Sequence, residues 1–316
     1  MACYYPHNVY QKNEPNENGK KPIRFKPAIG YDSPIQIPCG NCIGCRLEYS
    51  RQWAIRCIHE ASLHEDNCFI TLTYSDEHLP ENGTLVKKDF QDFMKRLRRK
   101  LERREFGKIK YYMCGEYGEK TYRPHYHACI FGFDFPDKIF WSQNKQGDNL
   151  YISKLLEDTW QKGYVRIGSV TFQSAAYVAR YVMKKAKGKK AKEISDETGL
   201  RFYERINTET GEIVRLQPEY TNQSRGGRQG KGIASGWFEN YKSDVYPSDF
   251  LVVNGKKMKP PRYYDSLFEL EEPETFENIK QRRKEHALES EDNTPQRLEQ
   301  RRINKQAQLG QLIRSL

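Results

Sequence analysis

Two histidines lie one residue apart in the segment Arg123-Pro124-His125-Tyr126-His127, immediately before an apolar run. On a β-strand, residues i and i+2 point to the same face, so His125 and His127 would project together. Two imidazoles on one face can converge on a single divalent ion. The spacing therefore predicts a metal site, and two surface histidines without a metal are the alternative.

A third ligand for such an ion must come from a neighbouring element. Glu116 ends the strand that precedes the histidines, and a short antiparallel connection would carry it back beside His125. Two histidines and one carboxylate leave open positions for substrate oxygens, which suits Mg²⁺ or Mn²⁺ acting on a phosphate. Glu60 is the alternative third ligand, although its helical spacing also fits a packing or capping residue. Of the two carboxylates, we favour Glu116.

Two tyrosines, Tyr177 and Tyr181, are four residues apart in a helical pattern. Their hydroxyls would lie about one turn apart on one helix face and could reach one site. A phenol has a pKa of about 10 and is a weak nucleophile unless a nearby cation favours the phenolate. Lys184 and Lys185 follow at positions from which either could supply that cation. Two aromatic core residues with solvated lysines behind them are the alternative.

Together, a polarising metal, paired tyrosines and basic surroundings make a site for phosphodiester transesterification. One tyrosine would attack the phosphate in line, form a 5′-phosphotyrosyl link and release a 3′-hydroxyl. The bond energy is kept in the adduct, so rejoining needs no ATP. A second tyrosine would allow a second cleavage while the first adduct persists, as required of an enzyme that cuts a new strand end and ligates the old one.

Three cysteines are bunched in Cys39-Gly40-Asn41-Cys42-Ile43-Gly44-Cys45, where the glycines let the backbone curl so that several sulfurs meet one ion. In a reducing compartment disulfides are not expected. A structural Zn²⁺ site needs four ligands, and Cys3 is the best fourth candidate because Cys57 and Cys68 lie inside periodic segments. The C-x2-C-x2-C spacing also fits part of an iron–sulfur pattern, but the closing C-x3-C-P is absent. Three ordinary buried cysteines are the alternative.

The elements that must position these residues follow from hydrophobic periodicity. Their order, strand–helix–strand–strand–helix–strand, predicts an α+β fold of the ferredoxin/RRM-like type, with a central antiparallel sheet flanked by helices. We expect strands at residues 68–74, 109–117, 125–133 and 164–170, and helices at 46–66, 87–105, 149–161 and 174–185.

The sequence pattern divides the chain into four segments. Residues 1–48 form an N-terminal segment with the cysteine cluster, and residues 49–190 form the core with the histidine and tyrosine pairs. Residues 191–265 hold a hairpin at 201–220 and a basic, glycine-rich stretch, and residues 266–316 form a charged, partly helical tail. The glycine-rich stretch lacks the spacing of a Walker loop, so we expect backbone contact with phosphate and no nucleotide hydrolysis.

The 316-residue chain carries a formal net charge of +11, which favours a polyanionic partner such as nucleic acid. Lys87–Lys110 has 11 basic and 4 acidic residues, and Arg180–Lys190 has 6 basic residues and no acidic ones. No run approaches the roughly 20 apolar residues of a membrane span, and the first residues lack the order of a signal peptide, so we expect a soluble cytoplasmic protein. The residues predicted to contact nucleic acid are Arg96, Arg99, Lys100, Arg123, Arg180 and Lys187.

Three segments of the chain resemble the motifs of HUH rolling-circle replication initiators and occur in the same order. They are Phe69–Tyr74, Arg123–His127 and Tyr177–Lys185. Two further segments, Pro38–Arg46 and Gly230–Tyr241, resemble the initiators of small single-stranded DNA phages of the microvirus group, in its gokushovirus branch. The resemblance spans Cys3–Pro247 and therefore most of the chain.

The resemblance implies an HUH endonuclease that nicks and rejoins DNA at a phage origin. Its partners would be single-stranded or supercoiled origin DNA and a host helicase and polymerase, in the cytoplasm of the host bacterium. Tyr126 departs from the family pattern, which has an aliphatic residue between the histidines. The implied metal ligands, nucleophiles and helix lysine are, in that order, His125 and His127, Tyr177 and Tyr181, and Lys184 or Lys185.

Two other classes of function fit parts of the sequence. A noncatalytic single-stranded nucleic-acid-binding protein would use sheet aromatics and basic helices, but it leaves the histidine and tyrosine pairs unexplained. A metal-dependent hydrolytic nuclease would activate water instead of tyrosine, and it would keep cleaving in the variant Tyr177→Phe/Tyr181→Phe. A covalent protein–DNA adduct distinguishes the tyrosine mechanism from both.

Overall fold

The computed structural model describes residues 3–17, 21–104, 106–118, 121–186, 189–207, 209–225, 231–289 and 291–311. For residues 181–184, 189, 190 and 288 it describes the backbone alone. The chain divides into two compact units, the first formed by Met1–Tyr49 with Glu274–Arg314 and the second by Ser50–Pro273. The first boundary between them falls inside helix α1 (Ile43–Ala61).

A seven-stranded sheet organises the second unit, and each neighbouring pair of its strands is antiparallel. β-Branched and aromatic residues, which favour extended backbone, are frequent in its central strands. In sheet order the strands are β12 (Tyr220–Gln223), β5 (Lys110–Tyr117), β6 (Pro124–Phe131), β4 (Asn67–Tyr74), β9 (Gly163–Gly168), β8 (Asn149–Ile152) and β7 (Ile139–Gln143).

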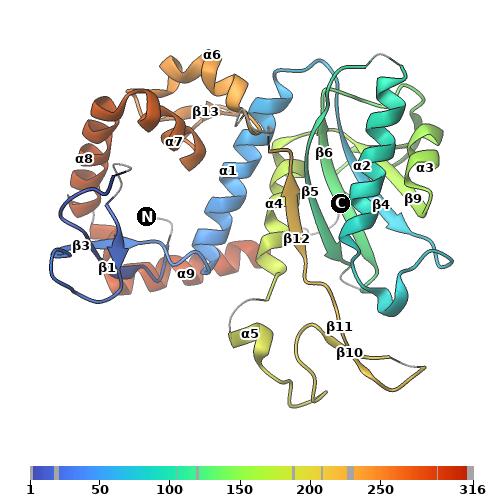
Figure 1. The fold of residues 1–316 in the computed structure, drawn as a ribbon, viewed down its shortest axis with the longest axis horizontal. Helices are drawn as coiled ribbons and strands as arrows, with labels where there is room; N and C mark the ends of the chain where they lie inside the picture. The colour runs from blue at the N-terminus through green and yellow to red at the C-terminus, as the bar shows by residue number, and fades with distance from the viewer. Residues whose placement is uncertain are drawn as a thin grey trace. The chain divides into compact units, whose positions relative to one another are not determined.

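One face of this sheet packs on α2 (Lys87–Glu102) and α3 (Lys154–Trp160), as Figure 1 shows. Alternate residues of β4, Ile70 and Leu72, point to this face and are fully buried. Phe93 of α2 packs in the same cluster, as part of the apolar stripe that the helical spacing predicts. Burial of this stripe holds the helix on the sheet.

The opposite face of the sheet packs on α1 and α4 (Phe172–Lys184), which lie across the sheet from α2 (Figure 1). The Trp53 ring of α1 stacks on Tyr112 of β5 with 4.3 Å between ring centroids. At the start of α4, the side chains of Thr171 and Ser174 each bond the other residue's backbone amide, which forms a capping box. This cap fixes the point over the sheet at which the tyrosine-bearing helix begins.

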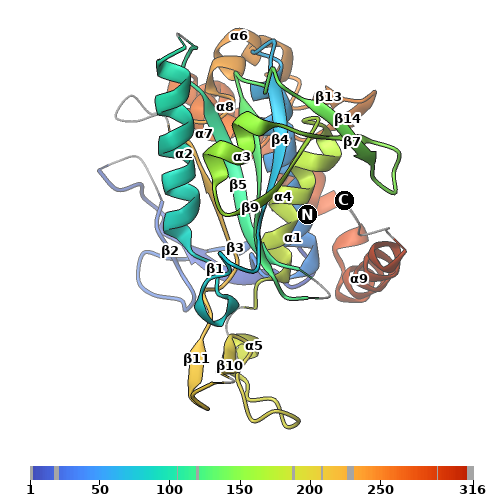
Figure 2. The same cartoon turned by 90° about the vertical axis from the view of Figure 1, so that its right-hand side faces the viewer.

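The second unit also contains smaller elements. A hairpin and the short helix α5 extend beyond one end of the sheet in both views (Figures 1 and 2). The elements outside the sheet are a 3₁₀ turn at Glu81–Gly83, α5 (Lys189–Lys192), β10 (Glu204–Ile206), β11 (Ile213–Arg215), α6 (Ser235–Val245), β13 (Leu251–Val253), β14 (Lys256–Met258) and α7 (Arg262–Glu271).

The first unit combines the two ends of the chain. In its small antiparallel sheet, β1 (His7–Gln11) lies between β2 (Ile23–Arg24) and β3 (Ser33–Ile37). Two C-terminal helices complete the unit, with a 3₁₀ turn between them. They are α8 (Pro273–Glu289) and α9 (Pro295–Gly310), and the turn is Glu291–Asn293.

The predicted α+β class, with an antiparallel sheet flanked by helices, is confirmed. The predicted helix at 149–161 is wrong at its start, because residues 149–152 form β8. The Ser153 hydroxyl accepts a hydrogen bond from the Leu156 amide at 3.1 Å, and this cap delays the start of α3 until after the strand. β7, which pairs with β8, is a strand that the sequence pattern does not predict.

Three further expectations concern the rest of the chain. The hairpin expected within residues 201–220 is present as β10 and β11. Residues 226–230 of the glycine-rich stretch lie outside the described residues. Among the helices that the structure describes, none combines the length and the apolar character needed to cross a lipid bilayer.

Candidate active site

Glu116 of β5 and His125 and His127 of β6 lie together on the sheet face that packs on α1 and α4. Glu116 pairs directly with His125 across the two strands. Nε2 of His127 is 2.9 Å from Oε1 of Glu116, and Nε2 of His125 is 3.5 Å from the same oxygen. The potential ligand atoms of the three residues all lie within 4.8 Å of one another. The structure thus brings together the three residues that the sequence analysis selected.

The Glu116 side chain is almost fully buried, with 2% of the residue exposed. Burial alone would raise the pKa of this carboxyl, but hydrogen bonds from His125 and His127 outweigh it and hold the pKa below its ordinary value. Glu116 is therefore a charged carboxylate at neutral pH. A buried negative charge of this kind needs cationic or hydrogen-bonding partners, and here the two imidazoles supply them.

Thr71 of the neighbouring strand β4 orients His127. Its Oγ1 lies 2.9 Å from Nδ1 of His127, and the ring of Phe69 stacks on the imidazole at 5.8 Å between centroids. Because Nδ1 is engaged by Thr71, Nε2 is the nitrogen that faces Glu116. Sequence reasoning missed Thr71, since its place opposite His127 becomes visible only when β4 is known to pair with β6.

Tyr177 of α4 reaches the same site. Its hydroxyl donates to Oε1 of Glu116 at 3.4 Å, and its ring meets the His127 ring edge-on at 5.2 Å between centroids. The Ser50 hydroxyl of α1 donates to the Ala176 carbonyl at 2.9 Å and so joins the two helices beside this tyrosine. A candidate nucleophile and a candidate metal site therefore occupy one place.

The other predicted catalytic residues are described only in part. Tyr181 and Lys184 belong to the backbone of α4, one and two turns after Tyr177, and their side chains lie outside the described residues. Lys185 caps the C-terminal end of α4 and is half-buried.

The donor set of Glu116, His125 and His127 fits a divalent cation. Two imidazole nitrogens and one carboxylate oxygen can bind one side of an ion and leave its other positions for water or phosphate oxygens. Such an open set of three is typical of catalytic metal sites, whereas structural sites are closed by four protein ligands.

Glu60, the alternative third ligand, is used elsewhere in the fold. Its fully buried carboxylate accepts hydrogen bonds from the Ala234 amide at 2.6 Å and from the Lys110 ammonium at 3.0 Å. It also lies 3.0 Å from Nε2 of His64. These contacts outweigh the effect of burial and lower the pKa of Glu60. Glu60 therefore joins α1, β5 and the start of α6 at the opposite end of β5 from Glu116.

The predicted nucleic-acid contacts fall into two groups. Arg96 donates to the carbonyls of Thr159 and Trp160 at 2.8 and 3.1 Å, and Lys100 donates to the Thr159 hydroxyl at 3.0 Å. These two residues hold α3 against α2, on the sheet face that does not carry the histidines. Arg99 is exposed on the same helix.

The remaining basic residues lie nearer the histidines in the sequence or on α4. Arg123 donates to the Tyr74 carbonyl at 2.9 Å and forms an ion pair with Asp76. Arg180, on α4, is half-buried and donates to the Ala176 carbonyl at 3.3 Å. Lys187 lies outside the described residues.

Comparison with known proteins points to viral replication. The model of a family of replication-associated proteins, named for the ORF2 protein, matches residues 67–186, a range that contains β4 to α4 and the whole candidate active site. The replication-associated protein ORF2 of Spiroplasma virus 4 is 32% identical over 305 residues, which are 91% of this chain and 87% of that protein.

Two further relatives cover smaller parts. The replication-associated protein VP4 of Bdellovibrio phage phiMH2K is 35% identical over 245 residues, 76% of this chain and 70% of that protein. The replication-associated protein ORF4 of Chlamydia phage 1 is 35% identical over 153 residues, 47% of this chain and 38% of that protein. No solved structure matches the chain.

Proposed function

The chain belongs to the ORF2 family of replication-associated proteins of microviruses, and on that basis we propose that it initiates phage replication by nicking single-stranded origin DNA through a tyrosine. The family supplies the role in viral replication. The tyrosine chemistry is proposed from one observation, the meeting of the Tyr177 hydroxyl, the Glu116 carboxylate and the His127 ring on one sheet face.

Each residue of the site has a defined part in this proposal. Glu116, His125 and His127 would hold Mg²⁺ or Mn²⁺, which supplies positive charge to a bound phosphate and orients it. The Tyr177 oxygen attacks phosphorus and the bond to the 3′ oxygen breaks, so the proton lost by Tyr177 ends on the released 3′-hydroxyl. The 5′ side of the strand is then linked to the protein, and attack by a 3′-hydroxyl reverses the step and rejoins DNA.

The residues after Tyr177 on α4 extend this chemistry. Tyr181 is the proposed second nucleophile, which receives a second strand end while the first adduct persists. Lys184 and Lys185 are proposed to place positive charge near the tyrosines, which favours the phenolate and the charge that develops on the phosphate.

The order of the central strands supports a ferredoxin-like HUH domain. β4, α2, β5, β6, α3 and β9 follow one another along the chain, with the β7–β8 hairpin inserted before α3. In the sheet these strands lie in the order β5-β6-β4-β9, so the first strand lies between the third and the fourth. Both helices pack on one face, as in the split βαβ arrangement.

The surroundings of the reaction are also part of the proposal. The protein would act in the cytoplasm of the infected bacterium, on single-stranded or supercoiled origin DNA, with a host helicase and polymerase. Arg99, Arg123, Arg180 and Lys187 are the proposed DNA contacts, because the contacts of Arg96 and Lys100 give those two a structural role.

A covalent adduct tests the proposal directly. The full-length protein is incubated with Mn²⁺ and labelled single-stranded oligonucleotides that tile the phage genome, and the products are separated in SDS. We expect one oligonucleotide to transfer the part on the 3′ side of the cut to the protein through its 5′-phosphate. The other product should end in a 3′-hydroxyl. Cleavage without an adduct would favour the hydrolytic nuclease, and binding without cleavage would favour the noncatalytic binder.

Substitution of the tyrosines completes the test. The variant Tyr177→Phe/Tyr181→Phe should form no adduct, while each single variant keeps some nicking of the first strand. Tyr241→Phe, which changes an exposed tyrosine of α6 in the same way, is the matched control and should react as the wild type does. Cleavage at the wild-type rate by the double variant would refute the tyrosine mechanism.

A further inference from the structure

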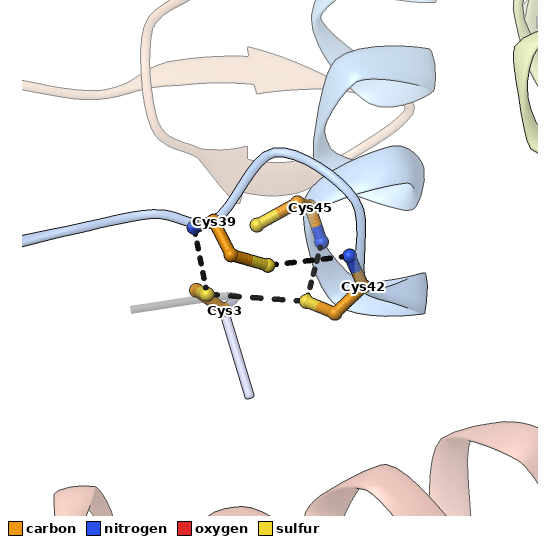
Figure 3. Close-up of side chains that lie close together, drawn as sticks. All are labelled: Cys3, Cys39, Cys42 and Cys45. Atoms are coloured by element: carbon orange, nitrogen blue, oxygen red, sulfur yellow. Dashed lines mark hydrogen bonds between the residues drawn. The ribbon is translucent and has the colours of Figure 1, made fainter. Parts of the chain in front are cut away.

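Four cysteines of the first unit converge on one point, as Figure 3 shows. Cys39, Cys42 and Cys45 come from the turn and first turn of α1, and Cys3 comes from the residues before β1. Their sulfurs all lie within 4.8 Å of one another, and those of Cys3 and Cys42 are 3.9 Å apart. Four sulfurs bound at about 2.3 Å to one tetrahedral ion would be about 3.8 Å apart, so this is the spacing of ligands to a single ion.

Backbone amides point at three of these sulfurs. The amide of Cys39 donates to Sγ of Cys3 at 3.2 Å, that of Cys42 to Cys39 at 3.3 Å, and that of Cys45 to Cys42 at 3.5 Å. Gly40 has a φ of +73°, the left-handed conformation that lets the chain curl around the sulfurs. Amide donors and the nearby N-terminus of α1 stabilise a thiolate over a thiol, and the thiolate is the form that binds metal.

The N-terminal segment has little else to hold it. Among the described residues between 3 and 49, the buried apolar side chains are those of Cys3, Tyr4 and Val9. No residue of β2 or β3 is buried. A segment with so small a core normally depends on a disulfide or a metal ion for its stability.

We infer that Cys3, Cys39, Cys42 and Cys45 bind one structural Zn²⁺ ion, which joins the start of the chain to the first turn of α1. Four protein ligands leave no position for a substrate, so this ion has no catalytic part. An iron–sulfur cluster binds its cysteines through several irons and would hold the sulfurs farther apart. A disulfide needs sulfurs at about 2.05 Å, and all four cysteines are free thiols.

Metal analysis of the full-length protein tests the inference. After dialysis against EDTA, we expect mass spectrometry to find one tightly bound zinc per chain and no iron. Cys39→Ala should lose this zinc, whereas Cys68→Ala, which removes a buried thiol of β4, should keep it. Zinc that remains in Cys39→Ala, or that is lost from His127→Ala instead, would overturn the inference.

A measurement on the unchanged chain covers the case in which Cys39→Ala does not fold. Protein produced with Co²⁺ in place of zinc should show the intense sulfur-to-cobalt absorption of a tetrahedral tetrathiolate site. Protein that holds neither zinc nor cobalt after dialysis, or that carries the visible absorption of iron, would overturn the inference.

A separate feature lies on the sheet face of the candidate active site. There α1 and α4 lie over the β5 and β6 side, while Thr71 and Thr73 of β4 are only half-buried. The strand register places side chains of this face in two rows that cross β6, β4 and β9. The rows are His127, Thr71, Arg166 and His125, Thr73, Tyr164.

Large aromatic side chains are exposed at the far end of these rows. Tyr164 is 64% exposed, and Trp141 of β7 is 53% exposed. The guanidinium carbon of Arg166 lies 4.6 Å from the centre of the Trp141 ring, so a cation and an indole form one surface. Because neighbouring strands are about 4.8 Å apart, β9 lies about 10 Å from the histidines of β6.

We infer that Tyr164, Arg166 and Trp141 bind the bases and backbone next to the phosphate that is cut, an inference that rests on the proposed function. Exposed aromatic rings stack on any base, and an arginine between them contacts the phosphate backbone. The register places this surface beside the histidines and on the same face. A single strand whose phosphate reaches His125 can therefore lay a neighbouring base on Tyr164.

Binding measured in EDTA, where no cleavage occurs, tests this surface. For a fluorescent single-stranded oligonucleotide, we expect Tyr164→Ala and Trp141→Ala each to weaken affinity about 5- to 100-fold. Tyr164→Phe should bind as the wild type does. Phe140→Ala is the matched control, because Phe140 is next to Trp141 and 57% exposed, but its ring contacts Tyr151 instead.

The two proposals can fail separately. Equal affinities for the wild type, Tyr164→Ala and Trp141→Ala would overturn the binding surface, whether or not the protein cuts DNA. A wild-type protein that binds through Tyr164 and Trp141 but forms no adduct in Mn²⁺ would refute the tyrosine chemistry and support the binding surface.

Discussion

Two clusters of metal-binding side chains lie in different units of the chain and are built in opposite ways. Glu116, His125 and His127 lie on adjacent strands of a seven-stranded sheet, whose other face carries an extensive apolar core. The four cysteines lie on a turn and near a chain end, in a segment whose described residues bury few apolar side chains. The first set is open on one side, and the second is closed by four ligands.

The difference concerns whether the fold makes the site or the site makes the fold. In the second unit, strand pairing brings three ligands together, so an ion can enter and leave without changing the structure. In the first unit the ligands themselves connect distant parts of the segment, so the ion is part of the fold. The ligand chemistry agrees, since carboxylate and imidazole suit exchangeable divalent ions and thiolates suit zinc.

The largest effect is expected from removing a cysteine ligand. Cys42→Ala should unfold the N-terminal segment, because zinc binding contributes about 10 kcal/mol or more to the folding of small zinc domains. In hydrogen exchange, the amides of β1 and β3 should then exchange as in an unfolded chain, while those of β4 to β6 stay protected. Cys68→Ala is the control. Protection of β1 and β3 in Cys42→Ala would break the comparison.

Removal of a histidine ligand should have the converse result. His127→Ala should slow adduct formation by at least about 10³-fold, because the ion no longer stabilises the reacting phosphate, which corresponds to about 4 kcal/mol. The melting temperature should change by only a few degrees, since the fold does not depend on that ion. Single-turnover adduct assays and thermal melts measure the two effects. His78→Ala, in an exposed loop, is the control, and an unfolded His127→Ala would contradict the comparison.

The pH dependence of folding should separate the scaffold of the second unit from its metal ligands. Burial lowers the pKa of His59 from 6.5 to about 4, and its ring stacks on Trp237 at 3.5 Å between centroids. Between these pH values the unfolded chain binds a proton that the folded chain does not. Stability is therefore fully present above about pH 6.5 and falls by up to about 3 kcal/mol as the pH drops to 4.

Urea unfolding of the second unit in EDTA, followed between pH 4 and 7, measures this loss. His59→Phe should flatten the profile, whereas His78→Gln should leave it unchanged. A profile that appears only with Mn²⁺ present would mean that the ion, and not the scaffold, governs stability there.

Local periodicity was sufficient to predict much of the candidate site. Strand alternation placed His125 and His127 on one face, and the short connection between β5 and β6 brought Glu116 back beside them. The helical period placed Tyr177 on an element that reaches the same site. Each of these relations spans a strand, a turn or a helix, so it depends on few residues.

Relations between distant segments were not predictable in this way. Glu60 and Glu116 both lie in periodic segments, and only the contacts of Glu60 with Lys110 and Ala234 show what it does. The strand β8 runs directly into α3, so its four residues look like the start of the helix until β7 is seen to pair with them.

The smallest of the expected effects concerns Thr71, which becomes visible only through the pairing of β4 with β6. Thr71→Val keeps the shape of the side chain but removes the hydroxyl that holds Nδ1 of His127. Affinity for Mn²⁺ should fall about 10- to 100-fold, as it does when other partners of metal-bound histidines are lost. Calorimetry or paramagnetic relaxation measures that affinity, and Thr71→Ser should restore most of it.

Thr73→Val provides the control for this last effect. Thr73 lies two residues along β4, on the same face, and pairs with His125 in the register, so the two variants make the same change in the same strand. If they weakened Mn²⁺ binding equally, the effect would come from altered packing of β4 and not from the hydrogen bond. A loss confined to Thr71→Val would mean that the sheet fixes the orientation of a ligand before the ion arrives, whereas the cysteine cluster has no such preformed partner strand.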